Sequence, residues 1–156
     1  MLFLRALAAL LVLPGTFAGI IPALIASADH WRGNGHAAGM APLVAGILIL
    51  LWCVRDFYVA GKGTLAPWDP PKHLVVIGLY RFVRNPMYVG LILLLIGWAL
   101  LAGSFLLGGY ALFFAIAFHL RVVLYEEPRL KKQLPEEWSV YSATVPRWLP
   151  RLRGKN

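Results

Sequence analysis

The stretch Gly78-Leu-Tyr-Arg-Phe-Val-Arg-Asn-Pro-Met-Tyr-Val-Gly90 leads directly into an apolar segment as long as a membrane helix. Its Asn-Pro pair is typical of a helix start, because Asn is a favoured N-cap and Pro suits the first helical position. The free backbone N–H groups at such a start favour an anionic partner. Polar side chains at the depth of a bilayer surface indicate a functional site, here with Tyr80, Arg81, Arg84, Asn85 and Tyr88.

The composition indicates an integral membrane protein. Of the 156 residues, 60% are hydrophobic and 14% are charged, whereas soluble domains carry about 25% charged residues. One membrane helix needs about 20 apolar residues, so the chain has room for about four spans and for no second soluble domain.

We therefore predict an all-α fold, a polytopic membrane helix bundle that forms one domain over residues 1–156. The first apolar segment is longer than a typical signal-peptide core, so we interpret it as a retained helix, although Ala26-Ser27-Ala28 resembles a cleavage site. The predicted spans are residues 2–26, 40–60, 86–102 and 105–125, with a loop over 61–85 and a tail over 126–156 that contains short helices.

The basic residues predict the orientation. Residues 62–84 contain four Lys or Arg residues and the chain from Arg121 onward contains eight, while the loop near Asp29 contains only Arg32. Because basic loops stay in the cytoplasm, we expect the 61–85 loop, the tail and both termini on the cytoplasmic side. The net charge of +8 then favours anionic lipid headgroups as partners, and nucleic acid is not expected.

The fourth span carries ionisable residues, which are costly in a membrane and usually face a cavity or a partner. For His119, a hydrogen bond to a neighbouring helix and a catalytic role are both open, and Arg121 can also extend to the surface. Glu126 and Glu127 lie near the C-terminal end of the span, where the helix dipole disfavours anions. These carboxylates therefore need a cationic partner.

The remaining polar segments have several interpretations. Residues 61–71 are rich in Pro and Gly and form a rigid connector or a wall over a pocket. Residues 128–134 indicate a separate basic amphipathic helix, and Pro135 starts another, on which Trp138 and Tyr141 suit the membrane interface. No zinc, P-loop, dinucleotide-binding or serine-hydrolase motif occurs, so no metal is expected.

The order and spacing of two motif groups resemble the isoprenylcysteine carboxyl methyltransferase and phospholipid methyltransferase family, over roughly residues 61–151. Enzymes of this family are small integral membrane proteins that use S-adenosylmethionine. The first group is Lys72-His-Leu-Val, Gly78-x-Tyr80 and Arg84-Asn85-Pro86-x-Tyr88-x-Gly90; the second is Glu126-Glu127, Leu130, Trp138, Tyr141, Val145-Pro146-Arg147 and Pro150.

The resemblance implies a cofactor site on the cytoplasmic face and a lipid or lipidated methyl acceptor. A carboxylate acceptor needs no base and would be oriented by Arg121 or Arg147, whereas an amine acceptor must lose a proton to a group such as His119. Where the isoprenylcysteine branch has a substrate-binding Arg, this chain has Val122. The cofactor residues implied are His73, Leu74, Val75, Tyr80, Asn85, Pro86, Met87, Tyr88, Glu126 and Glu127.

Two other functions are compatible with the sequence. A lipid-binding or membrane assembly protein without catalysis would use the basic tail as a headgroup clamp. An NADPH-dependent sterol-type reductase has a similar C-terminal region, although this chain is short for one.

Overall fold

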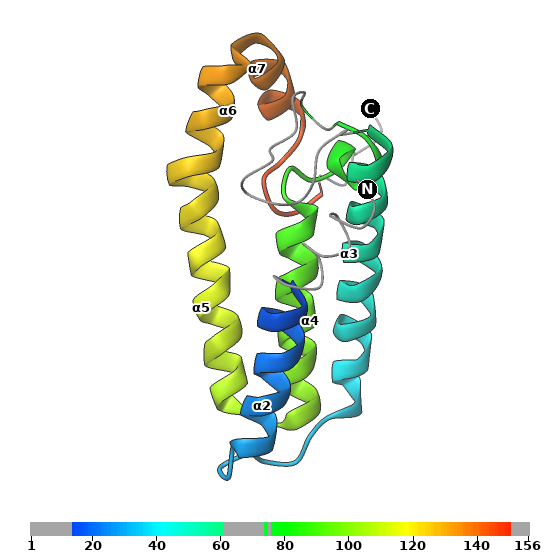
Figure 1. Ribbon diagram of the computed structural model, residues 1–156, viewed down its shortest axis with the longest axis vertical. Coiled ribbons are helices and arrows are strands. Elements are labelled where there is room, and N and C mark those ends of the chain that lie inside the picture. The colour runs from blue at the N-terminus through cyan, green and yellow to red at the C-terminus, as the bar shows by residue number, and fades with distance from the viewer. Residues whose placement is uncertain (1–13, 61–73, 75, 151–156) are drawn as a thin grey trace, which may run out of the picture.

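The computed structural model describes residues 14–60, 74 and 76–150, and within these ranges the chain is helical and contains no strand. Figure 1 shows the helices as a bundle of long rods with α6 and α7 at one end. The elements are η1 Thr16–Ile20, α2 Ile21–Ala28, η2 Ala37–Gly39, α3 Met40–Ala60, η3 Gly78–Arg81, α4 Pro86–Ala102, α5 Phe105–Arg121, η4 Val122–Glu126, α6 Glu127–Gln133 and α7 Pro135–Thr144.

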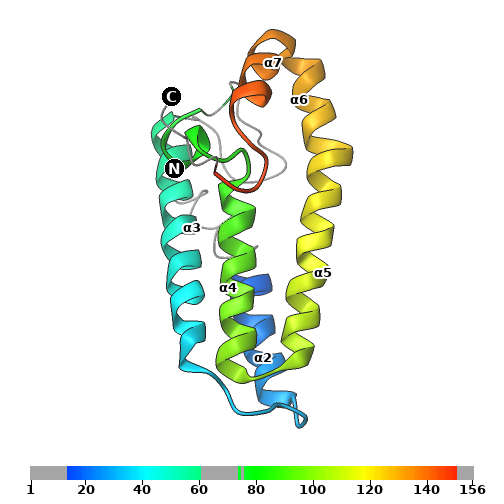
Figure 2. The same ribbon diagram turned by 180° about the vertical axis from the view of Figure 1, so that it is seen from behind.

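Helix α4 occupies the centre of the bundle, between α3 and α5 and beside α2 (Figures 1 and 2). The bounds of α3 and α4 agree with the predicted segments 40–60 and 86–102, which confirms the all-helical fold. At the opposite end from α7, Gly103 ends α4 with a φ of 61°, a left-handed conformation that glycine adopts without strain. The buried core joins five elements, η1, α3, α4, α5 and η4, through Ala18, Leu50, Tyr88, Leu91, Leu95, Ala111 and Val122.

Among the described residues, two helical segments are long and apolar enough to cross a membrane, Ala37–Asp56 and Phe105–Gln133. The segments Thr16–Ala28 and Pro86–Ala102 are apolar but shorter. The first predicted span, residues 2–26, lies partly outside the described residues, and its helix continues to Ala28.

The helix of the fourth predicted span, residues 105–125, continues past residue 125. Instead of ending at residue 125 before a separate helix, α5 continues through the π-helical turn η4 into α6 as one rod of 29 residues (Figure 2). Pro128 was read as a break because a proline cannot give the backbone hydrogen bond of a helix interior. The π-turn Val122–Glu126 adds one residue to the helical turn that precedes Pro128. The helix continues through this turn and past the proline.

Side chains of α4 and α5 compensate for the hydrogen bond that Pro22 cannot donate in the first described helix. Pro22 has no N–H group, so the carbonyls one turn earlier lose their intrahelical donor. Trp98 Nε1 donates to the carbonyl of Ala18 at 3.1 Å, and Tyr110 Oη donates to that of Phe17 at 2.9 Å. Side chains of α4 and α5 therefore satisfy the π-turn η1, as an apolar surrounding requires.

Glycines bring α3 and α4 into close backbone contact. A Cβ atom built on Gly46 would lie 2.6 Å from the carbonyl oxygen of Gly90 and 2.7 Å from the backbone nitrogen of Leu94. Small residues at such crossings permit the tight packing that holds helices together in a membrane. The position of the Gly78–Gly90 segment therefore depends on this crossing.

We expect Gly46→Ala to destabilise the protein by about 1–3 kcal/mol, because the added methyl group meets backbone atoms that have no room to move. The matched control is Gly108→Ala in α5, where a Cβ would meet nothing within 4 Å. Alanine favours helix over glycine by about 1 kcal/mol, so the control is expected to be neutral or stabilising. Thermal unfolding in detergent checks both, and equal effects would contradict the close contact.

The predicted membrane-interface position of Trp138 and Tyr141 was wrong. Both side chains are buried, at 7% and 6% exposure, in a small cluster with Val145. Leu74 and Leu130 pack against this cluster. Helix α7 folds back over η3, where Tyr141 Oη donates to the carbonyl of Tyr80 at 2.8 Å, so the aromatic residues join two chain segments instead of facing lipid.

Candidate functional site

The two motif groups meet at the end of the bundle near α6. Tyr88, in the first turn of α4, donates from its hydroxyl to Oε1 of Glu126 at 2.5 Å. Arg121 Nε donates to the same carboxylate oxygen at 2.8 Å and to the Tyr88 hydroxyl at 3.1 Å. These three side chains form one hydrogen-bonded group, which we call the Glu126 cluster.

Local helix geometry explains how Arg121 reaches Glu126. The two residues are five positions apart, and side chains at this spacing do not lie on the same face of a regular α-helix. The π-turn Val122–Glu126 lies between them and adds a residue to the turn. The Tyr88 ring is held from the other side by Phe118, with stacked rings 4.6 Å apart.

Only one oxygen of Glu126 takes part in these contacts. Every hydrogen bond that the described residues make with this carboxylate goes to Oε1, and the side chain is 29% exposed. The second oxygen, Oε2, makes no hydrogen bond with the described residues.

Glu127 is engaged through both oxygens. Arg147 binds it with two parallel hydrogen bonds, from Nε to Oε1 at 2.7 Å and from Nη2 to Oε2 at 2.8 Å. Arg84 Nη1 donates to Oε1 at 2.8 Å, and the Arg84 guanidinium also lies over the Trp138 ring, 5.4 Å from its centre. The cationic partners that the sequence required for the two glutamates are thus arginines of the same chain.

The Glu127 contacts fix residues 145–150, which follow α7. The backbone N–H of Arg84 donates to the carbonyl of Pro146 at 2.9 Å. Asn85 precedes α4 as predicted, but its side chain makes no capping hydrogen bond and donates instead to the carbonyl of Arg147 at 3.2 Å. Asn85 is therefore the N-cap residue of α4 by position, while its side chain binds the C-terminal segment.

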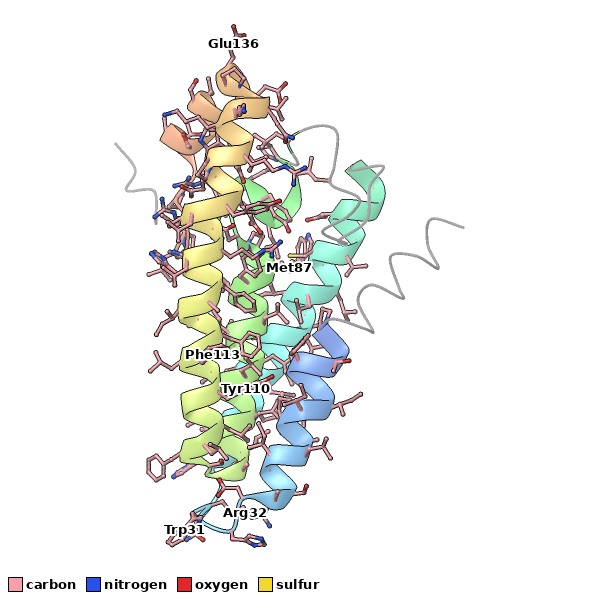
Figure 3. All side chains as sticks on the ribbon, turned by 60° about the vertical axis from the view of Figure 1, so that its left-hand side comes forward. Trp31, Arg32, Met87, Tyr110, Phe113 and Glu136 are labelled. Carbon is pink, nitrogen blue, oxygen red and sulfur yellow. The ribbon has the colours of Figure 1, made fainter. Side chains whose placement is uncertain are left out.

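The other predicted cofactor residues have different surroundings. Pro86 is buried at the start of α4, and Met87 packs against the core, pointing inward in Figure 3. Tyr80 is 8% exposed, and Leu74 packs against the Trp138 cluster. His73 and Val75 lie outside the described residues, as do most of the 61–85 loop and residues 151–156.

Burial and charge pairing shift two pKa values around the site. Burial raises the pKa of the Tyr141 hydroxyl to about 12, so that side chain is a neutral hydrogen-bond donor at physiological pH. The hydrogen bonds to Glu127 raise the pKa of the Arg147 guanidinium above its usual range. In the described part of the chain no group of three or more His, Cys, Asp or Glu side chains is placed to hold a metal ion.

His119 lies on the bundle surface, one residue from Phe118. It makes no hydrogen bond with the described residues, so the expected bond to a neighbouring helix is absent there, and its ring lies 6.0 Å from that of Trp148. Both rings line a groove of about 290 Å³ between α4 and α5. The other lining residues are Val89, Ile92, Leu93, Ala115 and Leu149.

Sequence reasoning missed two residues of this region, Phe118 and Trp148. Arg84 was expected beside an anionic group, and in the structure that group is the carboxylate of Glu127 in the same chain. Phe118 and Trp148 gave no sequence signal, since aromatic residues are common in membrane segments. Only their contacts with Tyr88 and His119 distinguish them.

Comparison with known proteins identifies the family. The sequence model of the family described as phospholipid methyltransferase matches residues 34–137, about two thirds of the chain. The match includes α3, α4, α5 and both glutamates, so the chain belongs to the phospholipid methyltransferase family. No curated protein and no solved structure matches the chain. Family membership indicates methyl transfer to a membrane lipid.

Proposed function

We propose that this protein is an S-adenosylmethionine-dependent methyltransferase that acts on a membrane-embedded lipid or lipidated substrate. The observation that carries the proposal is the hydrogen bond of 2.5 Å between Tyr88 and Glu126, which unites the two motif groups. An ordinary helix contact would not require a half-buried carboxylate, a tyrosine and an arginine at the membrane surface.

The chemistry of the Glu126 cluster suits this cofactor. S-adenosylmethionine supplies a methyl group from a positively charged sulfur and also carries an amine and a carboxylate. Glu126 Oε2 offers a negative oxygen for the positive groups. Arg121 uses only Nε in its hydrogen bonds to Tyr88 and Glu126, so its outer nitrogens are available for the carboxylate.

We assign the two glutamates different roles. Glu126 is the cofactor-binding carboxylate, with Tyr88 holding it in place. Glu127 was also expected to bind cofactor, but two arginines occupy both of its oxygens, and we propose that it fixes residues 145–150. The remaining predicted cofactor residues, His73, Leu74, Val75, Tyr80, Asn85, Pro86 and Met87, stay candidates for the wall of the site.

The surroundings of the basic residues favour His119 as the group nearest the methyl acceptor. Arg147 is bound by Glu127, and the outer nitrogens of Arg121 are assigned above to the cofactor carboxylate, so neither guanidinium is left to orient a carboxylate acceptor. His119 is exposed and faces a groove. An imidazole in that position can accept the proton that an amine acceptor must lose.

We propose that four segments cross the membrane, with the site on the cytoplasmic side. α4 runs between α3 and α5 over most of their length (Figure 1). If α3 and α5 cross the membrane, α4 therefore crosses it too. Figure 3 shows Trp31 and Arg32 at the opposite end from Glu136. The basic residues cluster at the Glu136 end, which the positive-inside rule assigns to the cytoplasm.

The test is transfer of a labelled methyl group from S-adenosylmethionine into a membrane lipid extract by the purified protein. Labelled lipid, identified by mass spectrometry, is the expected product. Calorimetric titration with S-adenosylmethionine and with NADPH distinguishes the proposal from a sterol-type reductase. If the protein neither transfers a methyl group nor binds S-adenosylmethionine, the proposal is refuted. That result would favour a lipid-binding protein without catalysis.

A further inference from the structure

The groove between α4 and α5 has no role in the contacts of the Glu126 cluster. Its walls are aliphatic side chains of α4 and α5, and residues 145–150 close one end with Trp148 and Leu149. Leu149 is 77% exposed, and the α5 wall of the groove belongs to a helix that is long and apolar enough to cross a membrane. The groove therefore opens toward the hydrocarbon of the membrane.

The residues that line the groove are sequence neighbours of residues in and around the Glu126 cluster. Val89 follows Tyr88 in α4, and His119 follows Phe118, whose ring stacks on Tyr88. Trp148 follows Arg147, which is bound to Glu127 by two hydrogen bonds. The contacts that fix residues 145–150 therefore also fix the wall of the groove.

The polar groups of the groove lie among apolar walls. His119 and Trp148 carry ring nitrogens, while the other lining side chains are aliphatic. This distribution matches a lipid with one chain against the aliphatic walls and its polar head beside the imidazole. Ligand sites usually combine apolar walls with a few polar groups in this way.

We infer that this groove holds one acyl chain of the lipid that accepts the methyl group, and that His119 lies beside that lipid's polar head. The inference rests on the proposed methyltransferase function. Ala115 lies on the α5 wall, where a larger side chain would occupy the space of the acyl chain. The site would thereby select long-chain over short-chain acceptors.

The experiment compares Ala115→Phe with the wild type, using a long-chain and a short-chain dispersion of the same headgroup as acceptors. Added methylene groups in an apolar pocket change kcat/KM by about tenfold or more. We expect Ala115→Phe to lose at least about tenfold more kcat/KM with the long-chain acceptor than with the short-chain acceptor. Ala115→Leu, a milder change in case phenylalanine disturbs folding, should change the ratio in the same direction.

The matched control is Ile116→Phe, the next residue of α5, which is 51% exposed and does not line the groove. Its ratio of long-chain to short-chain kcat/KM should equal that of the wild type. A second readout is photo-crosslinking with a diazirine on the acyl chain, which should label peptides of the groove less in Ala115→Phe.

The outcomes separate the two proposals. If the wild type transfers methyl groups but Ala115→Phe and Ala115→Leu keep its chain-length ratio and its labelling, the groove is not the acyl site and the inference is overturned. If the wild type binds no S-adenosylmethionine and transfers no methyl group, while diazirine labelling of the groove still falls in Ala115→Phe, the groove binds lipid and the methyltransferase proposal fails.

Discussion

Glu126→Gln is expected to weaken S-adenosylmethionine binding by at least about tenfold, since hydrogen bonds to a charged group contribute about 1.5–3 kcal/mol. The change removes the negative charge that faces the cofactor. It also places an uncharged amide against Arg121 Nε, which now donates to the carboxylate at 2.8 Å. Calorimetric titration of the purified protein measures the affinity, and labelled-methyl transfer should fall at least as far.

The matched control for Glu126→Gln is Glu136→Gln, an identical change at an exposed position in the first turn of α7. Figure 3 shows Glu136 at the tip of the bundle, at the end opposite Trp31 and Arg32. The control should bind cofactor as the wild type does. An affinity of Glu126→Gln within twofold of the wild type would remove this carboxylate from the cofactor site.

Glu127→Gln is expected to act mainly on stability. Glu127 and Arg84 are 17% and 13% exposed, and loss of one partner from a buried pair costs about 3–5 kcal/mol. Because Arg147 is more exposed, at 33%, we expect a loss of about 2–3 kcal/mol. Thermal unfolding in detergent measures it.

Loss of the Glu127 contacts should also release residues 145–150. The bond after Arg147 is a trypsin site that these contacts protect, so Glu127→Gln should be cleaved there faster than the wild type. Glu137→Gln, at an exposed position of α7, is the control and should change neither stability nor cleavage. If Glu127→Gln kept wild-type stability and cleavage but lost cofactor binding, the roles assigned to the two glutamates would be wrong.

Most of the fold followed from hydrophobic pattern and helix-start signals. The apolar runs and the Asn-Pro pair predicted α3 and α4 with their observed bounds. Proline was the main source of error. Pro128 indicated a helix break, but the π-turn before it let the helix continue to Gln133, and no local pattern announces such an insertion.

The sequence predicted which residues belong to the candidate site. It did not predict which of their side chains contact one another. The ionisable residues Arg121, Glu126 and Glu127 stood out because charge is costly near a membrane. Which arginine binds which glutamate depends on residues up to 43 positions apart. Trp138 and Tyr141 were misread for a related reason, since their spacing suits lipid contact and burial against η3 equally well.

The sequence by itself determined the helical class, the membrane-length segments and the family, because these depend on composition, on periodicity and on motifs read along the chain. Only the tertiary structure decided that the hydrogen bonds of Glu126 with the described residues use one oxygen, whereas those of Glu127 with arginines use both. The reason is geometric. Adjacent residues of a helix point about 100° apart, so two identical carboxylates face different neighbours once the helices have packed.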